Sequence, residues 1–229
     1  MTSKLEFNKI LNIHQSWNDF FIPFFKSGEL TKVLENISKT KYIPEKQNVF
    51  KSFSVPSDEV KVIIIGQDPY PNPKLATGIA FAVPNIMDSA SLRVIRDELF
   101  YYTSDITVDA TLDRSFNFWM EQGIMMLNSA LTTIPNKTGK HFKHWYPFMK
   151  DFVLYLDNLE QDLCFVLLGN QAQKFEQFIK VGKVLKFPHP AADKHSATNR
   201  FGGSGIFRLI DEFMLNKYNK KIQWLKESA

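Results

Sequence analysis

The pattern of apolar and polar positions along the chain predicts short buried strands separated by helices. The strongest run, 60–66, is nearly continuous in β-branched residues, and a strand tolerates such a run only when both of its faces are covered. Three further apolar runs, at 124–128, 163–168 and 184–187, predict three more strands. Because strands that alternate with helices form βαβ units, we expect an α/β fold with a parallel sheet.

Helical periodicity fills the segments between these strands. The first fifty residues suggest three helical pieces with an aromatic stripe, formed by Trp17, Phe20, Phe21, Phe24 and Phe25. A helix ending at Tyr102 has Ser89 or Ser91 as a candidate N-cap, and further helices are expected at 112–122, 147–159, 172–178 and 205–218. The 229 residues are 44% hydrophobic and contain no internal repeat, so we expect one domain, 1–229.

Polar residues stand at the carboxyl ends of all four predicted strands. They are Gln67 and Asp68, Asn128, Asn170 and His189. In an open parallel sheet these ends share the edge at which ligands bind, so four distant segments predict one site. Pro69, Pro71 and Pro73 fix φ and forbid helix, which should hold the loop in one conformation. An isolated Asp-Pro pair would more often be an ordinary turn.

Composition narrows the classes of function. No Gly-x-Gly-x-x-Gly or P-loop follows the first strand, which disfavours a dinucleotide or nucleoside-triphosphate site, and no Cys/His cluster has metal-ligand spacing. Cys164 lies in an apolar run and is expected to be a buried small hydrophobe in a reducing interior. No apolar segment approaches the ~20 residues of a membrane span, and the N-terminus lacks a secretory signal, so we expect an intracellular protein.

Basic residues are concentrated near the C-terminus, although the net charge is only +4. Residues 180–229 hold ten Lys or Arg against four Asp or Glu, and the rest of the chain carries a small negative excess. A solvated basic surface is the ordinary interpretation of such an excess. Its position beside His189 favours nucleic acid as the partner.

The segment Gly66-Gln67-Asp68-Pro69-Tyr70-Pro71 resembles the water-activating loop of the family 1 uracil-DNA glycosylases, and the resemblance extends from Ile43 to Trp224. It implies a central four-stranded parallel sheet flanked by helices. It also implies a monofunctional glycosylase that flips uracil out of DNA and hydrolyses its N-glycosidic bond in base excision repair, leaving an abasic site, without cofactor or metal. The expected partners are uracil-containing single- and double-stranded DNA and a proteinaceous uracil-glycosylase inhibitor. The expected protein is a monomer in the cytoplasm, or in the nucleus if eukaryotic.

The two expected catalytic residues follow from the charge that the reaction develops. Cleavage leaves positive charge on the sugar and negative charge on the base. A site therefore needs a carboxylate near the sugar and a hydrogen-bond donor near the base. Asp68 can stabilise the sugar and orient or deprotonate water, while His189 can donate to uracil O2; the resemblance assigns the same roles. A structural histidine at a strand end is an equally common alternative.

The resemblance implies four substrate-binding residues, Gln67, Tyr70, Phe81 and Asn128. The Asn128 carboxamide would accept from uracil N3–H and donate to O4, and cytosine would leave these groups unpaired at about 1–3 kcal/mol each. Tyr70 matches the ring that excludes the thymine methyl, and Phe81 matches the ring that stacks on the flipped base. Without this context, Phe81 would be ordinary core and Asn128 an ordinary strand end.

The expected DNA-binding residues are Ser91, Gly169, Asn170, Ala191, Asp193, Lys194 and Arg200. Ser91 corresponds to the serine of the family's proline-rich loop, with Ser89-Ala90 in place of its prolines, and Gly169-Asn170 stands where the family has Gly-Ser. Asp193 takes the place of the leucine that wedges into the emptied base stack, with Lys194, His195 and Arg200 as partial substitutes. We therefore expect a strong preference for single-stranded substrate, which Asp193→Leu should narrow.

Two rival functions remain open from the sequence. One is a DNA-binding or replication-accessory module without turnover, which the presence of both Asp68 and His189 disfavours. The other is a mismatch-specific glycosylase that accepts other bases, which Tyr70 and Asn128 disfavour.

Overall fold

The computed structural model describes residues 11–84, 86–103, 110–159, 161–194, 198 and 200–227, with only the backbone described at position 194. Its centre is a four-stranded sheet in the order β3-β1-β4-β5, and all three pairings are parallel. The strands are β1 (Val62–Gly66), β3 (Ile124–Asn128), β4 (Cys164–Leu168) and β5 (Lys183–Phe187). The predicted fold class is confirmed, and each predicted strand lies within two residues of its observed position.

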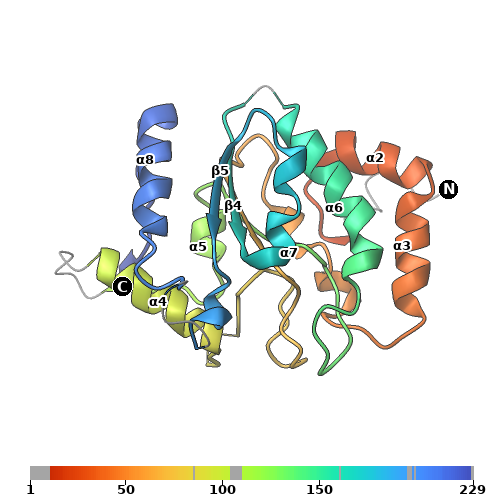
Figure 1. The fold of residues 1–229 in the computed structure, drawn as a ribbon. Coiled ribbons are helices and arrows are strands. Elements are labelled where there is room, and N and C mark those ends of the chain that lie inside the picture. The colour runs from red at the N-terminus through yellow and green to blue at the C-terminus, as the bar shows by residue number, and fades with distance from the viewer. Residues whose placement is uncertain are drawn as a thin grey trace.

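Helices cover both faces of this sheet (Figure 1). On one side lie α2, α3, α6 and α7, and on the other lie α8, α4 and α5. The helices are α2 (Asn18–Lys26), α3 (Glu29–Ser38), α4 (Ala90–Tyr102), α5 (Asn117–Met120), α6 (Phe142–Asp157), α7 (Gly169–Gln173) and α8 (Ile206–Tyr218). Short 3₁₀ turns are η1 (Gln15–Trp17), η2 (Lys46–Asn48), η3 (Lys51–Ser54), η4 (Glu176–Phe178) and η5 (Pro190–Lys194).

Three helix predictions were wrong in extent. The predicted helix 112–122 shrinks to α5, because the Asp113 carboxylate accepts from the backbone N–H groups of Ser115 and Phe118 and folds the preceding residues into a turn. The predicted helix 172–178 divides into α7 and η4, and α6 begins at Phe142, five residues before Pro147. A proline interrupts one backbone hydrogen bond there without ending the helix.

Two short strands were not predicted. β2 (Ala110–Thr111) pairs antiparallel with β6 (Lys226–Glu227), which ties the C-terminal segment to the start of the α5 region. A two-residue strand shows no measurable periodicity, so its pairing partner cannot be inferred from the apolar pattern.

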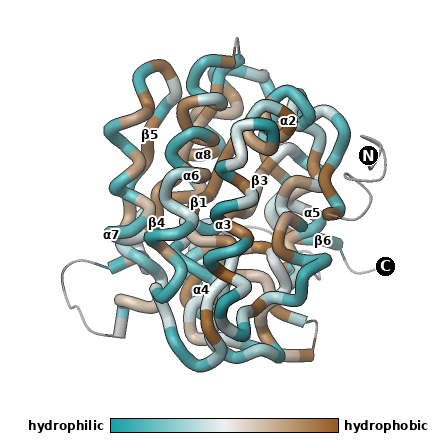
Figure 2. Tube along the Cα trace, turned by 90° about the vertical axis from the view of Figure 1, so that its right-hand side faces the viewer, coloured by the Kyte–Doolittle hydropathy of each residue, from teal (hydrophilic) through white to brown (hydrophobic). Residues whose placement is uncertain are grey.

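The hydrophobic core contains β1, β3 and β4, Phe187 of the edge strand β5, and an aromatic cluster between α2, η3 and α6. Figure 2 shows hydrophobic segments in the interior around β1 and β3. Trp17, Phe53 and Phe152 pack edge to face or tilted, with ring centroids 5.0–5.6 Å apart. Phe25, expected in the same stripe, is instead 49% exposed. None of the described helices has the length and apolar character needed to cross a membrane.

Cys164 is buried, as the apolar run around it predicts. Burial raises the pKa of its thiol to about 12, so the side chain stays protonated and unreactive at neutral pH.

Candidate active site

A cavity of about 290 Å³ lies at the carboxyl ends of the parallel strands, at the sheet edge where a site was expected. The sheet register places Gly66, the last residue of β1, opposite Asn128, the last residue of β3. The cavity brings together residues from segments far apart in the sequence: Gln67, Asp68, Pro69, Tyr70, Pro71, Ala76, Thr77, Gly78, Ile79, Phe81, Ser91, Asn128, Thr138, His189 and Ala191. Both predicted catalytic residues and all four predicted substrate-binding residues are among them.

Asp68 is held by a loop that the sequence did not single out. Its Oδ2 accepts a 2.5 Å hydrogen bond from the backbone N–H of Gly139, and the same loop is fixed to the proline-rich segment by a 2.8 Å bond from Asn136 N to Pro71 O. Burial raises the pKa of the Asp68 carboxyl, while hydrogen bonds from Gly139, Thr133 and Gln67 oppose that rise. The carboxylate is therefore oriented by backbone and only partly solvated.

Asn128 and Phe81 share one corner of the cavity because Gly66 leaves them room. A Cβ atom at Gly66 would lie 2.8 Å from Phe81 Cζ and 3.1 Å from Asn128 Oδ1. The Asn128 side chain is 6% exposed, and no described residue hydrogen-bonds its carboxamide. Both the oxygen and the amide of this side chain are therefore free to pair with a ligand in the cavity.

Phe81 adopts a backbone conformation that bulky residues rarely take, with φ at +62°. The Thr77 hydroxyl lies within hydrogen-bond distance of the carbonyl groups of Ile79 and Ala82, on either side of this residue. The Phe81 ring lies 5.5 Å from the His189 ring at an angle of 45°. Backbone strain of this kind concentrates at binding sites, where the surrounding structure fixes a side chain for a ligand.

The Tyr70 hydroxyl donates to the Phe81 carbonyl at 3.1 Å and accepts from the Ser89 hydroxyl at 2.7 Å. Burial raises the pKa of Tyr70 to about 12. The ring is therefore a neutral wall of the cavity, fixed at its outer end by two hydrogen bonds.

His189 is arranged as a neutral donor. Its Nδ1 accepts a hydrogen bond from the backbone N–H of Ala191 at 3.1 Å, which assigns the proton of the neutral ring to Nε2. Burial lowers the pKa of His189, so the ring is neutral at pH 7. Gly169, with φ at +84°, allows the close approach, because a Cβ there would lie 2.8 Å from His189 Cβ.

The expected DNA-binding residues divide into three groups. Ser91 and Ala191 line the cavity itself, and Ser91 is only 4% exposed. Gly169 is buried under His189, whereas Asn170 and Arg200 are exposed. The side chains of Lys194 and His195 lie outside the described residues.

Asp193 is a correction to the expectation of an exposed wedge position. Its side chain is 4% exposed and accepts the backbone N–H groups of Phe201, at 2.5 Å, and Gly202, at 2.8 Å. The carboxylate points into the loop and holds its two ends together. It does not occupy the surface position that a wedge requires.

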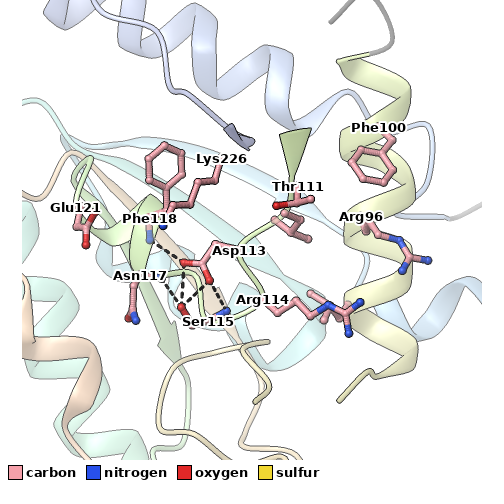
Figure 3. Close-up of a pocket in the computed structure, with 12 residues that line it drawn as sticks. Arg96, Phe100, Thr111, Asp113, Arg114, Ser115, Asn117, Phe118, Glu121 and Lys226 are labelled. Carbon is pink, nitrogen blue, oxygen red and sulfur yellow. Dashed lines mark hydrogen bonds between the residues drawn. The ribbon is translucent and has the colours of Figure 1, made fainter. Parts of the chain in front are cut away.

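A second, larger groove of about 750 Å³ lies between α4, the β2–β6 pair and α5 (Figure 3). Arg114 and Lys226 line the groove with Asp113, and Arg96 lies across it on α4. The Asp113 carboxylate is already used by Ser115 and Phe118, and these hydrogen bonds lower its pKa although burial raises it. The groove has no histidine, so the smaller cavity at the sheet edge is the better candidate for catalysis.

The described residues contain no cluster of three or more His, Cys, Asp or Glu side chains suited to hold a metal ion.

Comparisons with known proteins point to the same chemistry. A family model described as the uracil DNA glycosylase superfamily matches residues 53–201. A uracil-DNA glycosylase from Azobacteroides pseudotrichonymphae genomovar. CFP2 is 32% identical over 93% of this chain and 99% of its own length. A uracil-DNA glycosylase from Mycoplasmopsis pulmonis (strain UAB CTIP) is also 32% identical, with the same coverage of both chains.

Solved structures agree with these sequence relatives. The crystal structure of mimivirus uracil-DNA glycosylase is similar with a TM-score of 0.79 and 28% identity, over 93% of this chain and 87% of that chain. A substituted form of the mimivirus enzyme, solved in complex with UGI, is similar with a TM-score of 0.80 and 26% identity, over 93% of this chain and 88% of that chain.

Proposed function

The chain belongs to the uracil DNA glycosylase superfamily and is a monofunctional uracil-DNA glycosylase of base excision repair, and we propose that Asp68, Asn128 and His189 carry its reaction. One observation supports this assignment above the others. Three side chains from the ends of three different strands face one cavity of about 290 Å³. His189 has the tautomer and Asn128 the free polar groups that their proposed roles need.

Uracil is recognised by the edge and the faces of its ring. The Asn128 carboxamide accepts from N3–H and donates to O4, which cytosine cannot match. Phe81 stacks on the flipped base, and Gln67 completes the polar lining. The Tyr70 ring, which lines the cavity, faces C5 of the flipped base in this arrangement, so a methyl group at C5 is excluded.

Hydrolysis breaks the bond between C1′ of the sugar and N1 of uracil, and the electron pair leaves with the base. The anionic form of Asp68, whose carboxylate accepts from the backbone N–H of Gly139, lies against the sugar and stabilises its positive charge. His189 donates from Nε2 to uracil O2 as negative charge accumulates there. Water then adds its oxygen to C1′, Asp68 accepts the proton that this water loses, and the proton passes through solvent to the uracil anion, which leaves neutral uracil and an abasic site.

The surface around the cavity is the proposed DNA contact. Asn170 in α7, Ala191 in η5 and Arg200 in the segment that follows η5 suit contacts with phosphate groups. Ser91 and Gly169 are the further proposed contacts. Uracil-containing single- and double-stranded DNA are the proposed substrates. The mimivirus complex with UGI supports a protein inhibitor as a further partner. We also propose a monomer that acts inside the cell, in the cytoplasm or nucleus.

The proposed roles are tested by uracil release from matched single-stranded and duplex oligonucleotides in the presence of EDTA. Wild type should release uracil in chelator. Asp68→Asn, His189→Asn and Asn128→Ala should each remain folded and lose rate under single-turnover conditions. Full activity in any of these variants would remove that residue from the proposed mechanism, and activity that requires added divalent metal would overturn the metal-free reaction.

A further inference from the structure

Ser89 connects the start of a helix to the wall of the base cavity. It is the N-cap of α4, and its Oγ accepts the backbone N–H of Leu92 at 3.0 Å. The same hydroxyl donates to the Tyr70 hydroxyl at 2.7 Å. The side chain is 8% exposed, and its own backbone N–H donates to Asp88 Oδ1 at 2.8 Å.

The direction of these hydrogen bonds is forced by chemistry. A carbonyl oxygen cannot donate, so the Tyr70 proton must point to the Phe81 carbonyl, 3.1 Å away. The Ser89 proton must then point to the Tyr70 oxygen, and the Ser89 oxygen accepts from Leu92. Ser89, Tyr70 and Phe81 therefore form one ordered series, in which the outer end of the Tyr70 ring is fixed from both sides.

Both ends of this series are stiff. Ser89 is fixed by the 13-residue helix that it caps, and Phe81 by a left-handed backbone at φ +62°. The Tyr70 ring cannot swing away from the cavity without breaking the bond to Ser89 or the bond to Phe81. Of the two residues that fix the Tyr70 hydroxyl, Phe81 lines the cavity, whereas Ser89 does not belong to its lining.

We propose that Ser89 is a specificity-determining positioning residue, which holds Tyr70 in place and so sets the discrimination between uracil and pyrimidines substituted at C5. The inference rests on the proposed function, because it takes Tyr70 as the residue that excludes the thymine methyl group. Loss of the Ser89 hydroxyl should let the ring move outward and admit a bulkier C5 substituent.

The experiment separates this role from helix capping. Glycine is accepted at an N-cap at a cost of only a few tenths of a kcal/mol, so Ser89→Gly removes the hydroxyl with little effect on α4. Ser89→Thr keeps the hydroxyl. Ser27→Gly is the control outside the cavity lining, because the Ser27 hydroxyl accepts the N–H of Glu29 at the start of α3 and donates to the Phe24 carbonyl. For each variant, kcat/KM is measured for uracil, 5-fluorouracil and thymine in one oligonucleotide, together with Tm.

Ser89→Gly should raise the ratio of kcat/KM for 5-fluorouracil to that for uracil by about two- to tenfold, the effect of losing one neutral hydrogen bond. It should also produce detectable thymine release. Ser89→Thr and Ser27→Gly should retain the wild-type ratio. In a Tyr70→Phe background, which lacks the hydroxyl, Ser89→Gly should change the ratio no further.

Equal loss of activity toward all three substrates in Ser89→Gly, with a lower Tm, would overturn the inference and leave Ser89 as a helix cap only. A further change of the ratio in the Tyr70→Phe background would also overturn it, because the effect would then not pass through Tyr70. Failure of the proposed function would give a different result, because wild type itself would then release no uracil.

Discussion

Gly66→Ala should disable the base cavity through a single added methyl group. The new Cβ would lie 2.8 and 3.0 Å from two carbon atoms of the Phe81 ring and 3.1 Å from Asn128 Oδ1. Carbon atoms pack at about 3.5–4.0 Å, so the ring must retreat by roughly 1 Å. A misplacement of that size in a reacting complex costs about 10²-fold in rate. Overpacking should lower the free energy of unfolding by about 1–3 kcal/mol.

Gly182→Ala is the matched control at the opposite end of the sheet. Gly182 directly precedes β5, and a Cβ there would lie 2.5 Å from Phe165 Cε2, so the steric conflict with a phenylalanine ring is of the same kind. We expect a similar loss of stability in urea but a near-normal single-turnover rate of uracil release from the folded fraction. An unchanged rate in Gly66→Ala, or an equal loss of rate in Gly182→Ala, would refute the steric explanation of the cavity.

Three further predictions follow from the charged groups. Asp68→Asn should lose about 10²–10³-fold in single-turnover rate. Its Tm at pH 7 should nevertheless rise, because burial raises the folded-state pKa of Asp68 and the ionised carboxylate therefore destabilises the folded state above that pKa. A lower Tm in the variant would contradict this. Asp193→Leu should destabilise the protein by about 1–3 kcal/mol for each backbone N–H left unpaired, and Asp193→Asn by less. Urea unfolding, with the duplex to single-strand activity ratio measured alongside, checks whether Asp193→Leu acts on stability rather than on strand preference. Burial lowers the pKa of His189 in the folded state, so the unfolded chain binds more protons and the free energy of unfolding should fall as pH falls through about 6.5. His189→Asn should weaken this pH dependence of the free energy of unfolding between pH 7.5 and 5.5. An undiminished dependence in the variant would place its origin in other groups.

The fold and the centre of the site could be predicted because their signals are carried by side chains. Continuous β-branched runs mark buried parallel strands, and polar residues at their ends must meet at one edge. Asp68, Asn128 and His189 were found by this reasoning alone. The family resemblance then added Tyr70 and Phe81, whose aromatic rings would otherwise be indistinguishable from core.

The contacts that the sequence did not reveal are made by backbone groups or by side chains that bind two partners. The backbone N–H of Gly139 holds Asp68, and a glycine in a loop gives no sign of such a role. Ser89 could be recognised as an N-cap, but its second bond to Tyr70 joins residues 19 positions apart. The predicted helix 112–122 failed for a related reason, since the apolar spacing was adequate and the Asp113 turn overrode it.

The sequence did not reveal that the Asp193 side chain is buried, because a short acidic residue in a loop is usually a solvated charge. Here the segment 201–205 turns sharply and directs several backbone N–H groups inward. Asp193 accepts those of Phe201 and Gly202, and the buried Glu98 of α4 accepts those of Gly203 and Gly205. Both carboxylates point inward because these backbone N–H groups require acceptors, and the position of such groups is known only from the folded backbone.

Burial disfavours the charged form of both proposed catalytic residues, Asp68 and His189. It raises the pKa of Asp68 and lowers the pKa of His189, so it penalises both charged forms. His189 avoids the penalty by staying neutral, which is the form that donates from Nε2. Asp68 cannot avoid it, because only the anion stabilises the sugar. The low polarity that makes this anion costly also strengthens its attraction for the positive charge of the transition state. The rise in Tm expected for Asp68→Asn therefore reports the cost of keeping the Asp68 carboxylate charged in the buried site.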